Sequence, residues 1–247
     1  MNIITCLSLK GGTGKTATAL NTGAALRDLG KKVLFVDLDT QNSLAHTLGG
    51  SEEGTLAEFL QDPEAHSFTG CRYGHLLNRG TDPEEPADFM ALSSALKKIR
   101  NKFDFCVIDT PPALSESTVS GIAAASGLVI PARAEPFSLN SVSRLFGVLD
   151  ELREAEGIRP DVLGILLTAY HERRTLDQET ARQFRRLASR SGTKVFNTAI
   201  RDSVTMPESI AMRRSIFEYR KKAAIAEDFR QFTAELLNSI EEEGTTP

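Results

Sequence analysis

The chain has 247 residues, of which 40% are hydrophobic and 25% charged, and its formal net charge is −4. These values predict one globular domain spanning residues 1–247. No apolar run approaches the roughly 18–20 residues that cross a bilayer, and the start lacks the cationic segment of a signal peptide. Cys6, Cys71 and Cys106 show no C-x-x-C spacing, which argues against an iron–sulfur carrier and predicts a reducing cytoplasm.

The first predicted elements are a short strand near residue 3, a glycine-rich loop and a helix from Ala17 to Leu29. The loop reads Leu9-Lys10-Gly11-Gly12-Thr13-Gly14-Lys15-Thr16. Such glycines let backbone N–H groups converge on anionic oxygens, and the helix N-terminus adds partial positive charge. We therefore predict a phosphate-binding loop, in which Lys15 reaches the β- and γ-phosphates and Thr16 binds Mg²⁺. The alternative is a glycine-rich turn with incidental lysines.

A second strand is predicted over residues 33–36, where a continuous apolar run is typical of a strand buried on both faces of a parallel sheet. Asp37 and Asp39 follow at its carboxyl end, where ligands bind in open α/β sheets. Their spacing places both carboxylates on one side of an extended chain. An alternative role for Asp39 is merely to cap a helix.

A third strand is predicted from residue 103, and it ends in Asp109-Thr110-Pro111-Pro112. An apolar strand that ends in Asp is typical of the Walker B arrangement, which holds Mg²⁺ directly or through water. Prolines at this point end the strand and stiffen the following loop. Taken alone, the pattern also fits an ordinary buried strand whose terminal Asp caps a turn.

Further strand signals begin near residues 128, 162 and 194, with helical stretches between them. This alternation predicts an α/β fold, a mostly parallel twisted sheet flanked by helices. The stretch Gly80–Asp88 is predicted to form an acidic surface loop, and residues 241–247 a frayed tail.

The three motifs resemble those of the ParA/MinD family of P-loop ATPases, whose deviant Walker A loop reads K-G-G-x-G-K-[ST]. Leu9 stands where the usual motif has its first glycine, and Lys10 precedes the glycines. The block around Asp37 is similar to the family's D-x-D-P-Q, with Thr40 replacing the proline, and the residues from Asp109 are similar to D-x-P-P.

The resemblance extends to the C-terminal half. Leu128–Leu139 is similar to the family's V-I-P-x-x-x-E segment, and Lys194–Ile200 to the segment before the adenine-side loop. That loop departs from the I-P-R-N of many relatives, because this chain has Ile200-Arg201-Asp202-Ser203. The chain is closer to the short ParA proteins that lack an N-terminal DNA-reading domain.

The resemblance implies an ATPase with slow basal turnover that uses ATP and Mg²⁺. Lys10 is expected to cross the interface of an ATP-dependent homodimer to the other subunit's nucleotide, and Asp39 to orient the attacking water. The implied catalytic residues are Lys10, Lys15 and Asp39, and the implied metal ligands are Thr16 and Asp109. The implied nucleotide contacts are Lys10, Gly11, Gly12, Thr13, Gly14, Lys15, Thr16 and Ala17.

Charge is unevenly distributed along the chain. His171 to Arg230 contains fourteen lysines and arginines against eight acids, whereas Ser51 to Asp109 contains six against eleven. The basic stretch predicts a surface for sequence-independent binding to the DNA backbone. The alternative is a solvated face balanced by nearby acids. The candidate DNA-binding residues are Arg182, Arg185 and Arg186, spaced for one helical face, and Arg213, Arg214, Lys221 and Lys222.

The predicted function is partition or positioning of a DNA cargo by a cytoplasmic protein that joins the nucleoid when ATP-bound. A cargo-bound, ParB-like adaptor is expected to stimulate hydrolysis. The alternatives are a positioner of protein cargo, such as receptor arrays or microcompartments, an ATP-switched regulator without DNA binding, and a small-molecule kinase. No acceptor-binding motif favours the kinase. The acidic end Glu241–Glu243 argues against membrane binding, because anionic lipid would repel it.

Overall fold

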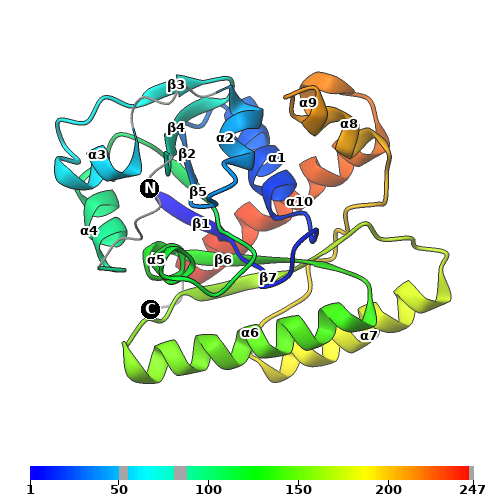
Figure 1. The fold of residues 1–247 in the computed structure, drawn as a ribbon. Coiled ribbons are helices and arrows are strands. Elements are labelled where there is room, and N and C mark those ends of the chain that lie inside the picture. The colour runs from blue at the N-terminus through cyan, green and yellow to red at the C-terminus, as the bar shows by residue number, and fades with distance from the viewer. Residues whose placement is uncertain (50–54, 81–87, 245–247) are drawn as a thin grey trace.

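A seven-stranded sheet forms the centre of the molecule (Figure 1). A computed structural model of the chain describes residues 1–49, 55–80 and 88–244, so residues 81–87 of the predicted acidic loop lie outside it. The strand order is β3-β4-β2-β5-β1-β6-β7, and neighbouring strands are parallel except β3 and β4. The strands are β1 (Asn2–Cys6), β2 (Val33–Asp37), β3 (Thr69–Cys71), β4 (Gly74–Asn78), β5 (Phe105–Asp109), β6 (Gly127–Arg133) and β7 (Asp161–Thr168). The mostly parallel sheet confirms the predicted fold class.

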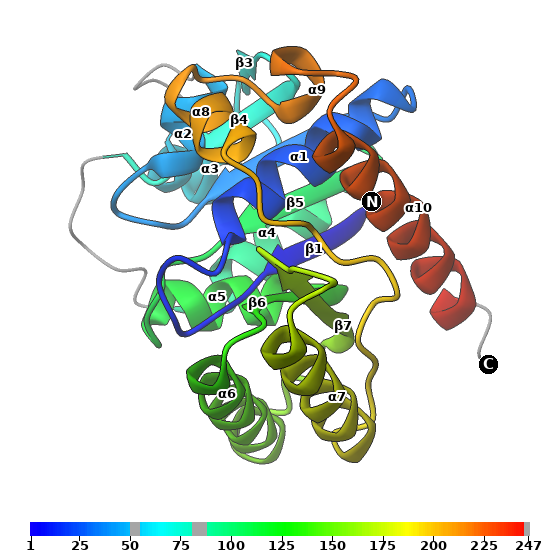
Figure 2. The ribbon, with the colours of Figure 1, turned by 90° about the vertical axis from the view of Figure 1, so that its right-hand side faces the viewer.

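Helices cover both faces of the sheet (Figures 1 and 2). One face packs against α1 (Lys15–Asp28), α2 (Ser43–Leu48), α8 (Thr205–Ala211), α9 (Ile216–Tyr219) and α10 (Ala224–Gly244). The other packs against α3 (Leu56–Gln61), α4 (Ala91–Lys98), α5 (Glu116–Ala124), α6 (Pro136–Ala155) and α7 (Thr175–Arg190). Such double coverage explains why the central strands read as uninterrupted apolar runs.

Strand β2 shows this arrangement residue by residue. Phe35 belongs to the core beneath α1, whereas its neighbour Leu34 belongs to the core beneath α3 and α4. Every residue of β2 and of β5 is buried. Apolar side chains therefore fill both faces of the sheet interior, and the polar residues Asp37 and Asp109 appear only where these strands end.

Helix α1 lies unusually close to β2, because Gly23 faces the Phe35 ring. A Cβ atom built on Gly23 would lie 2.2 Å from ring carbons of Phe35, far inside van der Waals contact. The absence of a side chain at this position sets the distance between helix and sheet. It thereby also sets how far from the sheet the loop that enters α1 at Lys15 lies.

The structure departs from the predictions at two places. The expected strand near residue 194 is a single parallel bridge between Ile165 and Val195. It stops there because the next free backbone N–H groups, of Asn197 and Thr198, donate to the carboxylate of Glu235 on α10. The short β3–β4 hairpin was not predicted. Within the stretch predicted as a frayed tail, residues 241–244 belong to α10 and residues 245–247 lie outside the described residues, so the fraying stays a prediction.

Within the residues that the structure describes, no helix combines the length and the hydrophobicity needed to cross a bilayer.

Candidate nucleotide-binding site

The polar residues singled out in the sequence meet at the carboxyl edge of the central strands. The register pairs Asp109 of β5 with Cys6 of β1 on one side and with Asp37 of β2 on the other. The glycine-rich loop leaves β1 at this edge and returns into α1. In open α/β sheets this edge is where ligands bind.

The glycine-rich loop has a conformation that needs glycine at two points. Gly12 and Gly14 have φ angles of 73° and 88°, in the left-handed region that side chains disfavour. Gly14 directly precedes α1, and the side chain of Thr168 at the end of β7 donates to the carbonyl oxygen of Thr13 at 2.8 Å. The loop is therefore fixed from the side, with Gly11 and Gly12 exposed and open to an anion.

Asp109 and Thr16 form the innermost contact of the site. The Thr16 hydroxyl donates to Asp109 Oδ2 at 2.6 Å, and Asp109 is fully buried. Among the described residues, the other carboxylate oxygen, Oδ1, has no hydrogen-bond partner. Burial, followed by the nearby Asp37 carboxylate, raises the pKa of Asp109 to about 8. An unpartnered buried carboxylate oxygen beside a hydroxyl suits a divalent cation, so these two residues fit Mg²⁺.

Lys15 is the cation of this group and is itself only 7% exposed. Burial lowers the pKa of its ammonium group, and the carboxylates of Asp109 and Asp39 act in the opposite direction. A buried ammonium at the start of α1 supplies a fixed positive charge, as a phosphate site requires.

Asp37 and Asp39 have different surroundings. Asp37 is fully buried and accepts from the backbone N–H groups of Ala45 and Asp39, at 2.9 and 3.1 Å, so it holds the turn into α2. Burial raises its pKa to about 6. Asp39 is partly exposed and accepts from the backbone N–H of Gln41 at 3.0 Å. Asp39 is thus the member of the pair that a ligand can reach, although it also stabilises a turn.

Lys10 is held at the rim of the site by its own chain. Its ammonium group lies 3.0 Å from Glu135 Oε2 and 3.3 Å from Ser138 Oγ, at the start of α6. Arg133 binds the other oxygen of the same carboxylate at 2.9 Å. The hydrogen bond from Lys10, and the charges of Lys10 and Arg133, hold the pKa of Glu135 below its usual range. The sequence did not predict this contact.

A pocket of about 400 Å³ adjoins the loop and would take the rest of a nucleotide. Its lining joins the loop and the start of α1 to Thr168, to the predicted adenine-side segment Ile200–Ser203, and to α8 and α10. The pocket residues that the sequence analysis missed are Thr18, Arg133, Thr168, Ala169, Val204, Met206, Pro207, Ile225 and Phe229. Ile225 and Phe229 of α10 follow the helical spacing of core residues, so the sequence does not distinguish them from the core.

The α8 wall of this pocket is tied to α1 through Asn21, which is completely buried. The Asn21 amide donates to the carbonyl oxygen of Ala17 at 2.8 Å and lies 3.7 Å from the sulfur of Met206. Its oxygen accepts from the backbone N–H of Ile216 at 2.8 Å. One side chain thus connects α1, α8 and α9.

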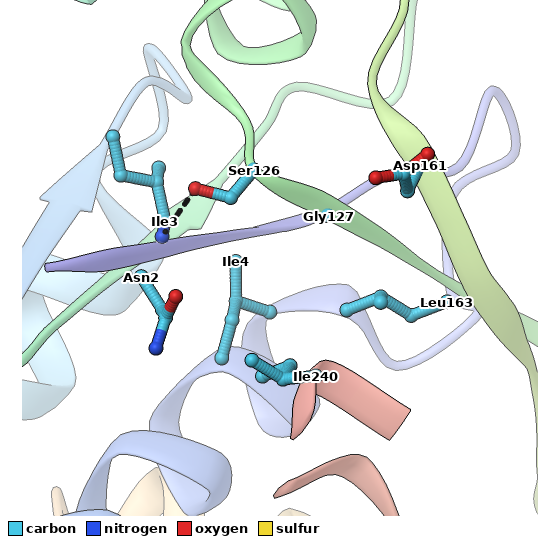
Figure 3. A pocket seen from close by; sticks show the side chains of 8 residues that line it. All are labelled: Asn2, Ile3, Ile4, Ser126, Gly127, Asp161, Leu163 and Ile240. Atoms are coloured by element: carbon cyan, nitrogen blue, oxygen red, sulfur yellow. Dashed lines mark hydrogen bonds between the residues drawn. The ribbon is translucent and has the colours of Figure 1, made fainter. Parts of the chain in front are cut away.

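A smaller cavity of about 200 Å³ lies at the opposite, amino-terminal edge of the sheet (Figure 3). Figure 3 shows Ile3 on β1, with its backbone N–H donating to Ser126 Oγ at 3.1 Å, and Ile240 of α10 below. No lysine or arginine lines it, so it offers nothing to a phosphate and contains none of the motif residues.

The candidate DNA-binding residues fall into two groups. Arg182, Arg185 and Arg186 lie on α7, beside α6, whereas Arg213, Arg214, Lys221 and Lys222 flank α9, at the other end of the molecule (Figures 1 and 2). Arg182 pairs with Glu179 at 3.1 Å, and Arg214 with Glu218 at 3.3 Å. The structure therefore does not gather these cations into one continuous cluster.

Comparison with known families agrees with the geometry of the site. A family model described as the CobQ/CobB/MinD/ParA nucleotide binding domain matches residues 4–216. The chain belongs to this family. The finding confirms the resemblance that the three motifs carry.

Individual members of the family are similar over most of the chain. The chromosome-partitioning ATPase Soj of Thermus thermophilus is 34% identical over 239 residues, 94% of each protein. The maintenance of carboxysome distribution protein A of Synechococcus elongatus is 38% identical over 180 residues, 67% of this chain and 71% of that protein. A crystal structure of Mycobacterium smegmatis cobyrinic acid a,c-diamide synthase, with ATP analogue and magnesium, has a TM-score of 0.81 and 25% identity, covering 100% and 98% of the two chains.

Proposed function

We propose that the protein is a ParA-like ATPase, which binds Mg–ATP, forms a face-to-face homodimer and binds DNA without regard to sequence. In this role it positions a cargo, and an adaptor on that cargo stimulates hydrolysis and so releases the DNA. The family assignment and the partitioning ATPase Soj, similar over 94% of the chain, support this proposal.

The position of Lys10 is the observation that carries the proposal. Lys10 belongs to the phosphate-binding loop, yet its ammonium group lies on Glu135 and Ser138 at the rim. Lys15 alone supplies the buried positive charge inside the loop. A second loop lysine at the rim can turn to a second subunit's phosphates once it leaves Glu135, whereas the phosphates of its own subunit are already served by Lys15.

The residues of the site divide the work of hydrolysis. The loop and Lys15 bind the phosphates, and the Thr16 hydroxyl and Asp109 carboxylate hold the metal. Mg²⁺ at this position neutralises charge that develops on the transferred phosphoryl group. Asp39 orients the attacking water. The γ-phosphate favours the dimer, so its loss returns the protein to single subunits.

A protein cargo is the second candidate. The carboxysome distribution protein of Synechococcus is 38% identical to this chain, a higher value than that of Soj, although over a shorter span. The chemistry of the site would be the same for both cargoes. Co-purification of the adaptor with the ATP-bound protein distinguishes them, because the adaptor belongs either to a DNA-bound complex or to a protein assembly.

The first test is the association state. Light scattering of an Asp39→Ala variant should give a dimer with Mg–ATP and a monomer with Mg–ADP, because the variant binds nucleotide but hydrolyses it slowly. The ATP-bound dimer should also retain random-sequence duplex DNA at low salt. A monomer under both nucleotide conditions would contradict the proposed switch.

A further inference from the structure

A polar cleft of about 700 Å³ lies next to the nucleotide pocket, and the site described above does not use it. Its walls are the loop 170–174, α7, the segment 197–202 and the first turns of α10. Arg201 and Asp202 line both the cleft and the nucleotide pocket. The two spaces are therefore neighbours that share one wall.

Most acidic side chains of this cleft interact with a basic side chain, whereas, within the described residues, three of its arginines form no ion pair. Arg201 donates through Nε and an NH2 group to both oxygens of Asp228, at 2.7 and 2.6 Å. His171 Nε2 lies 2.8 Å from Asp202 Oδ2. The remaining charged lining residues are Glu172, Arg173, Arg174 and Arg185, all of them exposed. In the described part of the chain, none of these three arginines forms an ion pair.

The loop that carries Arg173 and Arg174 is fixed before any ligand arrives. The backbone N–H of His171 donates to the buried carboxylate of Asp177 at 2.9 Å, and Gln178 Nε2 donates to the carbonyl oxygen of Glu172 at 2.8 Å. The backbone N–H of Arg174 closes the turn onto the His171 carbonyl at 3.0 Å. Because this backbone is already ordered, a ligand has to immobilise only the arginine side chains.

We propose that this cleft binds the phosphate backbone of duplex DNA, through Arg173, Arg174 and Arg185. The inference rests on the proposed function and specifies which surface of the protein contacts the DNA. Guanidinium groups without carboxylate partners bind phosphate oxygens without first losing an ion pair. Arg182 and Arg214 would have to give up Glu179 and Glu218. Contacts to phosphate oxygens carry no sequence information, so binding through these arginines ignores sequence.

The test is DNA affinity as a function of salt for the full chain with Mg–ATP. Each arginine that contacts a phosphate makes the slope of log K against log salt more negative by about 0.9. Changing Arg173, Arg174 and Arg185 together to Gln should therefore make the slope less negative by about 3 per subunit. The same triple change should weaken DNA binding at least tenfold. The corresponding Arg→Lys triple variant should keep most of the slope, because it keeps the charges.

A matched control removes the same charge elsewhere. Arg100, Arg144 and Arg159 are exposed and lie outside the cleft, so changing these three to Gln should leave the slope nearly unchanged. ATP hydrolysis without DNA should stay unchanged in all variants, which shows that they fold.

The outcomes separate the cleft from the proposed function. Equal weakening by the cleft and control variants, or loss only when Arg213 and Arg214 are changed, would overturn the cleft assignment and leave DNA binding in place. A wild-type protein that binds no DNA with Mg–ATP, even at low salt, would overturn both.

Discussion

Replacing Asp109 by asparagine should stabilise the protein at neutral pH while lowering its turnover. Burial raises the pKa of this carboxyl from 3.8 to about 8, so the folded protein holds a proton that the unfolded chain releases above pH 4. Stability therefore falls as pH rises from about 4 to 8. At about 1.4 kcal/mol per pH unit, ionisation of the unfolded chain weakens folding by about 5 kcal/mol at pH 7.5.

The Asp109→Asn variant has no such proton to lose. The amide that replaces the unpartnered Oδ1 oxygen is also buried without a hydrogen-bond partner among the described residues, which offsets part of this gain, so we expect a net gain of about 2–5 kcal/mol at pH 7.5. The gain should shrink by about 1.4 kcal/mol for each pH unit on the way to pH 5. Urea unfolding without nucleotide or metal, at pH 5.0 and 7.5, measures the stability difference between variant and wild type at each pH.

In an Asp109→Ala variant, turnover should fall at least about tenfold, or about 1.4 kcal/mol at the transition state.

Asp150→Asn is the control, because the Asp150 side chain is 71% exposed on α6. Its stability should match that of the wild type at both pH values. An Asp109→Asn protein that gains equally at pH 5.0 and 7.5, or that loses stability at pH 7.5, would refute the reasoning from burial.

Three further predictions follow from the site and from α1. Lys10→Ala should weaken the ATP-bound dimer while sparing nucleotide binding by single subunits, whereas Lys15→Ala should remove that binding; equal losses, measured with a fluorescent ATP analogue, would contradict a role for Lys10 across the interface. Asp39→Ala should slow phosphate release in single-turnover assays while leaving ATP affinity within about threefold. Gly23→Ala should cost about 1–3 kcal/mol in urea unfolding because its Cβ meets a ring at 2.2 Å, whereas Gly147→Ala, with open space around it, should stabilise α6.

The sequence predicts those parts of the fold that local physics determines. The interior runs 33–36 of β2 and 162–167 of β7 are free of polar side chains because both faces of the sheet are covered. The phosphate loop is equally local, since its glycines, lysines and following helix lie within a few residues of one another. Asp109 follows from the same logic, because a carboxylate that ends a fully buried strand has to lie at the sheet edge.

What the sequence does not predict depends on contacts between distant segments. Lys10 and Glu135 are 125 residues apart, and nothing near Lys10 reveals its partner. The strand expected at Val195 is limited to one bridge, because Glu235 on α10 binds the N–H groups that would have continued it. The unpaired arginines of the cleft are equally hidden, since a sequence shows how many charges there are but not which of them are neutralised.

Asn21 holds one wall of the nucleotide pocket in place before a nucleotide binds. Because this buried amide bonds to α1 and α9 and contacts Met206 on α8, pulling α8 and α9 away from α1 would strand a buried donor or acceptor, at about 1–3 kcal/mol. The wall of the pocket formed by Val204, Met206 and Pro207 therefore has its final conformation before a nucleotide binds and does not close over it. A nucleotide docks against a surface that already has its shape, and its association rate should depend on diffusion and charge rather than on the folding of a segment around it.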